Sequence, residues 1–497
     1  MTEPLLCELS VPDRRATRFP EADVPKSELP TGFLRDDLPM PELSELDVIR
    51  HFTRLSQLNY SIDSGMYPLG SCTMKYNPKV NEETARLAGF SAVHPLQPIS
   101  TVQGSLELMY TLQEYLGEIG GFASVSLQPA AGAHGEFTGL LIILAYHNAN
   151  GETKRDKILV PDSAHGTNPA TSSMSGLKVV ELKSDARGNI DLEALRAECD
   201  DTLVGLMFTN PNTLGLFDEN VEEVIRLVHE AGGLVYGDGA NMNALLGVVR
   251  PGDLGFDVMH YNLHKTFSTP HGGGGPGSGP VGVAAHLVDY LPDPVVGCNP
   301  IPKSEIKGGD EKTDIYHFIH PPKSIGRVKS FNGHFAMMVR AYTYIRMYGP
   351  DGLRKIAEHA VLNANYLYSQ LRDAYHIPYD RVCMHEFVVE GRWPDVPDIH
   401  ALDISKRMMD YGLHPPTNYF PLIVHESLMI EPTETESKQT LDAFVESMLN
   451  IAEEAHNSPE LLQNAPYTTP IGRLDEVKAA KELVLCCDVG AYFSNQE

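Results

Sequence analysis

Short apolar segments alternate with segments of helical periodicity between residues 157 and 259, and this alternation limits the fold more than any other feature. The segment 203–208 (LVGLMF) is continuously apolar, as a strand is when helices cover both faces of its sheet. Residues 221–228 carry apolar side chains on one helical face. The alternation predicts an α/β fold with a parallel sheet between helices. The predicted strands are Lys157–Val160, Leu177–Leu182, Leu203–Phe208, Leu234–Tyr236 and Val258–Met259.

The segments before and after this region do not show the strand–helix alternation. Seven prolines fall within residues 1–45, and since proline fixes φ and lacks an N–H, an extended arm is predicted there. A helical pattern over 353–371 and an apolar strand region from Tyr419 to Ile430 predict a smaller C-terminal α+β domain. The predicted parts are 1–95 (arm and entrance segment), 96–350 (large α/β domain), 351–465 (small domain) and 466–497 (tail).

Two helix starts are predicted from capping patterns. Asn220 and Glu223 are spaced like an N-cap and its third helical residue. Thr433 and Glu436 fit a capping box ahead of the helix that carries Leu441.

The charge balance excludes several classes of partner. Asp plus Glu outnumber Lys plus Arg by 66 to 39, and the net charge of −27 argues against nucleic acid and anionic membranes as partners.

The apolar run Leu140–Tyr146 is far shorter than the roughly 20 residues that span a bilayer. The N-terminus does not resemble a signal peptide, and the seven cysteines are scattered. We therefore expect free thiols in the cytoplasm and no metal site.

The segment Asn262–Pro280 (NLHKTFSTPHGGGGPGSGP) carries the first chemical signal. Lys265 follows a predicted strand, and a deprotonated lysine amine forms Schiff bases with carbonyl compounds. The glycines at Gly272–Gly275, Gly277 and Gly279 allow backbone N–H groups to approach an anion. A P-loop is excluded because its lysine comes after the glycines. Taken alone, this segment is better explained as a surface lysine beside a flexible loop than as a Schiff-base site.

Asp238 supplies the second signal. It ends a predicted strand, 27 residues before Lys265, at the sheet edge where ligands of α/β proteins collect. An aspartate there can keep the ring nitrogen of pyridoxal phosphate protonated. Asp-Gly is also a common turn, so the pair of Asp238 and Lys265 is more specific than either residue alone.

Three further segments can belong to the same pocket. Small residues from Ala131 to His134 open a predicted helix, whose free N–H groups can seat a phosphate, although a tight packing turn also fits. His165 follows a strand and can stack on a flat ring, yet a lone histidine is more often structural. Thr209 and Thr213 follow another strand, where they can bind the cofactor or a carboxylate or simply belong to an Asn-Pro turn.

Together these segments resemble the fold-type I pyridoxal phosphate enzymes, and among them the glycine cleavage system P-protein family in its two-subunit form. The resemblance extends from about residue 10 to Leu485. It implies a mostly parallel seven-stranded sheet with helices on both faces, a smaller C-terminal α+β domain and an extended N-terminal arm. The segments that carry it are Met66–Pro78, His94–Gln103, Ser163–Pro169, Gly237–Asn243, Leu263–Pro280, Pro322–Asn332 and Tyr419–Glu436.

The resemblance also implies the roles of the site residues. Lys265 would bond covalently to the coenzyme, Asp238 would pair with its ring nitrogen, and His165 would stack on its ring; Lys265 and His165 are the expected catalytic residues. The remaining expected cofactor contacts are Ala133, His134 and His264 near the phosphate, together with Ala240, Thr209 and Thr213.

The activity that the resemblance implies is glycine decarboxylation with release of CO2. The aminomethyl group left behind would pass to the lipoyl arm of the H-protein. In the two-subunit form of the family, a first subunit without the lysine pairs with the second as α2β2. The expected partners are therefore glycine, the lipoylated H-protein and that first subunit.

Several alternatives stay open at the level of sequence. The chain can be another fold-type I enzyme, such as an aminotransferase or a cysteine desulfurase, or a partner subunit without activity. A phosphate-binding module is disfavoured by the position of Lys265. Arg327 is one candidate for binding the substrate carboxylate, and Met66–Lys75 for lining the entrance. The pair Cys486-Cys487 has no assigned role.

Overall fold

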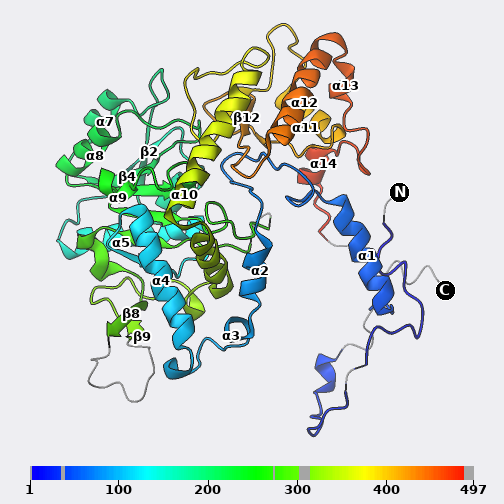
Figure 1. Cartoon of the computed structure of the whole chain (residues 1–497), viewed down its shortest axis with the longest axis horizontal. Helices are drawn as coiled ribbons and strands as arrows, with labels where there is room; N and C mark the ends of the chain where they lie inside the picture. The colour runs from blue at the N-terminus through cyan, green and yellow to red at the C-terminus, as the bar shows by residue number, and fades with distance from the viewer. Residues whose placement is uncertain (1–2, 19, 35–39, 273–274, 301–313, 486–497) are drawn as a thin grey trace. The chain divides into compact units, whose positions relative to one another are not determined.

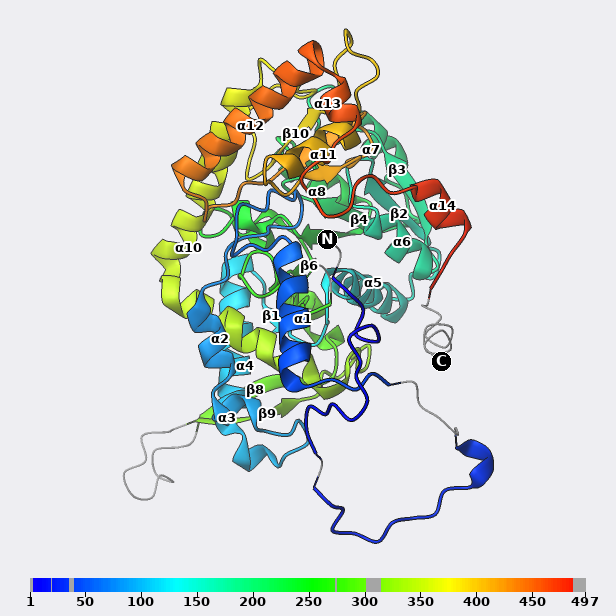
Figure 2. The same ribbon diagram turned by 90° about the vertical axis from the view of Figure 1, so that its right-hand side faces the viewer.

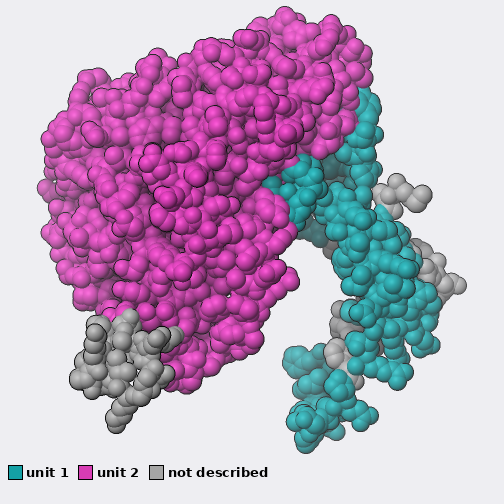
Figure 3. Space-filling model, viewed as in Figure 1, with its two compact units in different colours: residues 1–65, 464–497 teal, residues 66–463 magenta. Residues whose placement is uncertain are grey.

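The computed structural model describes residues 3–18, 20–34, 40–272, 275–300 and 314–485. Its contacts form two units, one of residues 66–463 and one of residues 1–65 with 464–497 (Figure 3). Among the residues named from the sequence, Gly273, Gly274, Cys486 and Cys487 lie outside the described part. The four-part division of the chain stays a prediction.

The larger unit is built on a seven-stranded sheet with the order β1-β7-β6-β5-β4-β2-β3. The two pairings of β7 are antiparallel and the other four pairings are parallel, which confirms the predicted sheet. All five predicted strands are present, and the three-residue strands β1 and β7 add two that the sequence did not indicate. The strands are β1 Ser124–Ser126, β2 Lys157–Pro161, β3 Lys178–Leu182, β4 Leu203–Thr209, β5 Leu234–Gly239, β6 Val258–Tyr261 and β7 Val281–Val283.

Helices cover both faces of this sheet (Figure 2). Alternate residues of β4 belong to different cores: Leu206 packs with the core that includes α4 and α8, and Met207 with the core that includes α5. Both side chains are fully buried, so the strand is apolar throughout rather than alternating. The helices around the sheet are α4 Gln103–Gly120, α5 Gly132–Ala149, α6 Thr167–Met174, α7 Leu192–Glu198, α8 Val221–Glu230 and α9 Pro251–Leu254.

A second, smaller sheet lies in the same unit, with the order β10-β12-β11. The region Tyr419–Ile430, predicted as strand-rich, forms a strand only at its end, because residues 419–426 make turns between two short strands. The long helix α10 changes direction at Gly349, whose φ is 63°. The elements are β10 Phe387–Glu390, β11 Thr417–Asn418, β12 Ser427–Ile430, α10 Phe335–Leu371, α11 Ala401–Asp410, α12 Lys438–Asn457 and α13 Glu460–Gln463.

One predicted helix start is confirmed and the other is wrong. Asn220 is the N-cap of α8, but its side chain makes no capping hydrogen bond. The cap of α12 is Ser437, whose side chain accepts from the N–H of Thr440, and not Thr433. Thr433 has a left-handed φ of 64° and its hydroxyl contacts Thr435, so the helix begins four residues later than the pattern indicates.

The smaller unit contains the proline-rich N-terminal residues. Before Ser44, its described residues form only the short 3-10 helix η1 Thr31–Phe33, in agreement with an extended arm. Ser44 and Asp47 then form a capping box at the start of α1. Figure 1 labels this helix. No helix among the described residues is long and apolar enough to cross a membrane. The remaining elements of the chain are α1 Glu45–Leu58, α2 Lys79–Ala85, α3 Ala88–Ser91, η2 Ile99–Thr101, η3 Met242–Ala244, η4 Ala285–Tyr290, β8 Val295–Pro300, β9 Asp314–Ile319, η6 Ser330–Asn332 and α14 Glu476–Lys481.

Candidate active site

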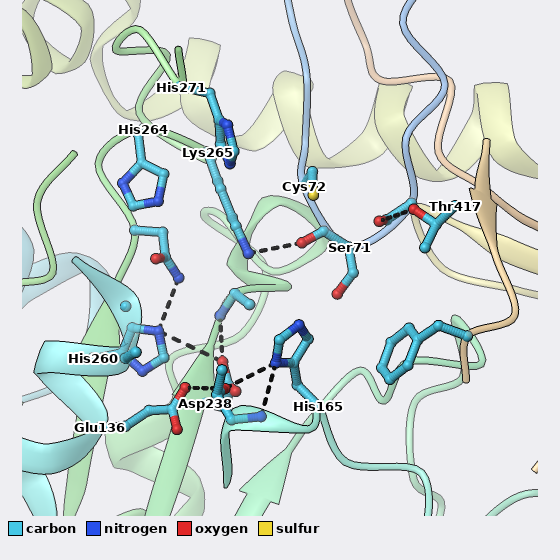
Figure 4. Close-up of a pocket in the computed structure, with 17 residues that line it drawn as sticks. Ser71, Cys72, Glu136, His165, Asp238, His260, His264, Lys265, His271 and Thr417 are labelled. Carbon is cyan, nitrogen blue, oxygen red and sulfur yellow. Dashed lines mark hydrogen bonds and ion pairs between the residues drawn. The ribbon is translucent and has the colours of Figure 1, made fainter. Parts of the chain in front are cut away.

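A cavity of about 640 Å³ opens at the carboxyl ends of the parallel strands, where ligands of α/β sheets bind. Its walls come from the ends of β5 and β6, the start of α5, the segment around Ser71 and residues near the smaller sheet. Figure 4 shows the side chains that point into it. They include Cys72, Glu136, His165, Asp238, Lys265 and Thr417.

Lys265 lies shortly after the end of β6, in a turn where its N–H donates to the carbonyl of Asn262 (3.1 Å). Its side-chain amine donates to the carbonyl oxygen of Ser71 at 2.7 Å (Figure 4). The amine is thus held in the cavity by a neutral acceptor rather than by a carboxylate. Such an amine is available to react with a carbonyl compound.

Asp238 is the penultimate residue of β5, and it is only 5% exposed. Its oxygens accept from the N–H of Ala240 (2.9 Å) and the side-chain amide of Asn168 (3.0 Å). Burial opposes its ionisation, but the nearby imidazole of His260 and these hydrogen bonds outweigh burial and lower the pKa of Asp238. An ionised carboxylate here can keep a proton on the ring nitrogen of a bound heterocycle.

His165 lies in the loop between β2 and α6, on the wall of the same cavity. Burial lowers the pKa of its imidazole, so the ring is neutral at pH 7. Its Nδ1 is 2.8 Å from the hydroxyl of Thr167, which is in turn 2.6 Å from Glu136. The ring meets that of Phe420 edge-on, with centroids 5.4 Å apart.

The start of α5 forms a further part of the wall. A Cβ on Gly132 would lie 2.6 Å from the side-chain oxygen of Asn262, so only glycine allows this close approach. Gly132 and Ala133 line the cavity at the helix N-terminus, where unpaired N–H groups favour an anion. His264 and His271 line the same cavity, and the buried Nδ1 of His271 has no partner among the described residues.

The predicted site residues fall into two groups. Lys265, Asp238, His165, Ala133, Ala240 and His264 all line the cavity. His134, Thr209 and Thr213 do not: His134 accepts from the N–H of Ala130, Thr213 donates to the carbonyl of Ser163, and the hydroxyl of Thr209 is buried without a described partner. Arg327 donates to Asn332 and does not line the cavity either.

Further wall residues come from two segments, and the sequence analysis had given an entrance role to one of them only. Gly70, Ser71 and Cys72 come from the segment predicted to line an entrance, whereas Thr417 and Phe420 come from the region of the smaller sheet. No local pattern marks the last two, since only folding brings them near Lys265. Burial raises the pKa of Cys72, which leaves it a thiol rather than a nucleophilic thiolate.

One group of side chains among the described residues has the spacing of metal ligands. It consists of His385, Glu386 and Glu431, whose ligand atoms lie within 4.8 Å of one another. Both oxygens of Glu386 already accept hydrogen bonds, from the N–H of Ser71 (2.6 Å) and from Asn241 (3.2 Å). One oxygen of Glu431 accepts from the N–H of Thr73 (2.9 Å). These carboxyl groups thus bind the backbone of the cavity wall.

The cavity fits pyridoxal 5′-phosphate. It combines a lysine amine, an ionised carboxylate, a neutral flat ring and a helix N-terminus that no Cβ at Gly132 obstructs. The Nδ1 of His271, which has no partner among the described residues, is a further polar group that an anionic ligand can engage. The donor set therefore suits an aldehyde, a basic ring nitrogen and a phosphate in one molecule.

Solved structures share this architecture. A crystal structure described as glycine decarboxylase (P-protein) of the glycine cleavage system, in inhibitor-bound form, superposes with a TM-score of 0.71 at 21% identity, covering 85% of this chain and 93% of that one. Glutamate decarboxylase of Lactobacillus brevis superposes with a TM-score of 0.61 at 14% identity, covering 88% and 96%. Fold and site define a fold-type I pyridoxal phosphate-dependent enzyme.

Sequence comparison narrows this class. A family model described as glycine cleavage system P-protein matches residues 18–304, and one described as glycine dehydrogenase, C-terminal domain, matches residues 356–466. Two relatives are named "Probable glycine dehydrogenase (decarboxylating) subunit 2". The one from Alkaliphilus oremlandii is 55% identical, and the match covers 97% of each chain. The one from Caldanaerobacter subterraneus is 56% identical, and the match covers 97% of this chain and 98% of the relative. The chain belongs to the glycine cleavage system P-protein family, whose cofactor is pyridoxal 5′-phosphate.

Proposed function

We propose that the chain decarboxylates glycine and passes the remaining aminomethyl group to the lipoyl arm of an H-protein. The observation that carries this proposal is the presence of Lys265 and Asp238 in one cavity of a chain of the P-protein family. The names of its relatives, which specify a decarboxylating glycine dehydrogenase, support the same substrate.

Each residue contributes in a different way. When bound, pyridoxal phosphate supplies an aldehyde that bonds to amines and a ring that accepts the electron pair of the broken C–C bond. Lys265 would hold the aldehyde carbon, and Asp238 would hold a proton on the ring nitrogen. His165 would pack against the ring face, and the N-terminus of α5 with His264 would bind the phosphate.

The wall opposite these residues would select and orient the substrate. Ser71 and Cys72 from one segment, together with Thr417 and Phe420 from another, line the same cavity as the amine of Lys265. Since glycine has no side chain, small and aromatic residues such as these are expected around it. The residue that binds the glycine carboxylate is not assigned by these contacts.

The partner proteins follow from the same family membership. The relatives are named as second subunits, so we propose a first P-protein subunit as a partner, in an α2β2 assembly, besides the lipoylated H-protein. A cytoplasmic location remains our prediction.

The desulfurase alternative has less support. That reaction uses a nucleophilic cysteine, and burial raises the pKa of Cys383 to about 12 and also raises the pKa of Cys72. Cys72 is nevertheless the cysteine that lines the described cavity, so a test must include it.

Exchange of labelled bicarbonate into the carboxyl group of glycine, with lipoylated H-protein and the first subunit present, tests the function. We expect exchange by the wild-type chain and by Cys72→Ala, and none by Lys265→Ala, which also loses the visible absorbance of the lysine-bound coenzyme. Coenzyme absorbance without glycine exchange would refute the proposed substrate. Sulfide release from cysteine that Cys72→Ala abolishes would favour a desulfurase.

A further inference from the structure

Glu136, Thr167 and His165 form a chain of contacts that ends in the cavity (Figure 4). Glu136 belongs to α5, Thr167 begins α6, and His165 precedes α6. Oε1 of Glu136 lies 2.6 Å from Oγ1 of Thr167, and that oxygen lies 2.8 Å from Nδ1 of His165. The other ring nitrogen of His165 points away from these contacts, into the cavity. The proposed function assigns no part to Glu136 or Thr167.

The positions of the protons in this chain can be worked out. The neutral ring of His165 carries one N–H. The backbone N–H of Thr167 donates to its Nδ1 at 3.2 Å, so Nδ1 has the lone pair and Nε2 has the proton. The hydroxyl of Thr167 then also donates to Nδ1, because two lone pairs at 2.8 Å would repel. With its proton used, Oγ1 must accept from Glu136, which therefore carries a proton.

An ionised Glu136 would reverse this chain. The hydroxyl of Thr167 would donate to the carboxylate, and His165 would donate from Nδ1 to Oγ1. The backbone N–H of Thr167 would then face another N–H at 3.2 Å. Nε2 of His165 would present a lone pair to the cavity in place of a donor.

We propose that Glu136 is a positioning residue whose protonated form, through Thr167, fixes His165 as the tautomer whose Nε2–H points into the cavity. A donor there can bind an anionic oxygen of the ligand, which a lone pair would repel. The inference rests on the proposed function only in taking that ligand to be glycine.

The surroundings of Glu136 agree with a neutral carboxyl group. Its side chain is buried, and burial together with the neighbouring charge of Asp238 raises the pKa of Glu136 to about 7. The hydroxyl of Thr171 donates to its second oxygen at 3.2 Å, which a neutral carboxyl group can still accept. The titratable groups facing this part of the cavity are Asp238 and Tyr236 from β5, His165, His260 from β6 and Lys265.

Ring-nitrogen NMR of the full chain with bound coenzyme tests the tautomer directly. In [15N]histidine-labelled protein, the signals of His165 are those missing from His165→Asn. We expect Nε2 protonated and Nδ1 unprotonated at about pH 6, with a shift toward the other tautomer as Glu136 ionises at higher pH. In Glu136→Gln the Nε2–H tautomer persists at every pH, because the amide donates to Thr167 and cannot ionise. A protonated Nδ1 at about pH 6, or an unchanged pH response in Glu136→Gln, overturns the proposal.

Variants of the two threonines provide matched controls. Thr167→Val removes the hydroxyl that joins Glu136 to His165, Thr167→Ser keeps it, and Thr171→Val removes a hydroxyl that contacts Glu136 but not His165. We expect Thr167→Val to weaken glycine binding about five- to tenfold, as for one lost hydrogen bond, and the other two to change it less than about twofold. Equal effects of Thr167→Val and Thr171→Val contradict the relay. If the chain does not bind glycine at all, the proposed function fails, while the NMR result still decides the tautomer.

Discussion

Asp238 and Glu136 are neighbouring buried carboxyl groups. The groups around them shift their pKa values in opposite directions. Asp238 accepts from a backbone N–H and from an amide, which stabilise its charge. The contacts of Glu136 with the hydroxyl groups of Thr167 and Thr171 do not offset burial and the neighbouring charge of Asp238, which raise the pKa of Glu136 to about 7. Below about pH 7, one cavity thus holds an ionised carboxylate beside a neutral one.

Asp238→Asn removes the charge that would keep the coenzyme ring protonated. We expect kcat for glycine exchange to fall by about a hundredfold or more, with bound coenzyme retained, because an amide cannot stabilise a ring cation. Steady-state exchange and the coenzyme absorbance measure the two effects. Asp257→Asn is the matched control, since Asp257 is also buried and holds the N–H of Val235 but does not line the cavity. Equal losses of kcat in both variants would contradict the role of Asp238.

His229 gives a prediction for stability against pH. A hydrogen bond to Asp257 raises the pKa of His229 in the folded chain. Its contribution to stability is therefore complete below the unfolded pKa and is lost as pH rises through the folded pKa. We expect His229→Gln to be destabilised at about pH 5.5 and little changed at about pH 9, as measured by urea unfolding. The exposed His359 supplies the control variant His359→Gln, and the same pH response in both would count against this assignment.

At the level of elements, the segment that faces Lys265 is held by the smaller sheet. Ser71 and Thr73 both have left-handed φ values, 63° and 44°, a conformation that costs non-glycine residues about 1–2 kcal/mol. Their N–H groups donate to Glu386 and Glu431, which lie next to strands β10 and β12. The carbonyl of Ser71 is thereby directed at the amine of Lys265.

Glu386→Ala should release this segment. The buried N–H of Ser71 would lose its acceptor, and we expect the folded chain to lose about 1–3 kcal/mol of stability. Coenzyme attachment to Lys265 should weaken as well, as measured by the absorbance of the lysine-bound form during dilution. Glu426→Ala removes a similar contact, to the N–H of Ala401, from a residue that does not line the cavity, and should cost stability without weakening coenzyme attachment. If Glu426→Ala weakens attachment equally, the segment is not specifically held by Glu386.

At the level of the whole molecule, one chain supplies the amine, the carboxylate and the stacking ring. Lys265, Asp238 and His165 all belong to the unit of residues 66–463. Among the described residues that line the cavity, Lys265 is the only lysine or arginine, so we expect the phosphate to be bound by backbone N–H groups and histidines.

We therefore expect this chain, expressed without a first subunit, to bind pyridoxal phosphate covalently. Glycine exchange should rise at least about tenfold when the first subunit is added, if the assembly completes the site. Absorbance of the purified chain and light scattering of the mixture measure coenzyme and assembly. A chain that takes up no coenzyme until the first subunit is present would contradict the expectation that its own residues suffice.

Local patterns identified a good part of this molecule. The buried strands were recognisable because both their faces are apolar, and Lys265, Asp238 and His165 because each follows such a strand. Thr209 and Thr213 follow a strand too, yet their side chains turn into the protein and not into the cavity. Position after a strand thus indicates the edge of the sheet but not the direction of a side chain.

The order of residues along this chain determined its strands, its helix faces and the ends of strands where chemistry can occur, because these depend on periodicity over a few neighbouring residues. Only the tertiary structure decided which distant groups share the cavity. Ser71, Glu136 and Phe420 come together from three separate parts of the chain, and their contacts and protonation depend on burial that no local pattern encodes.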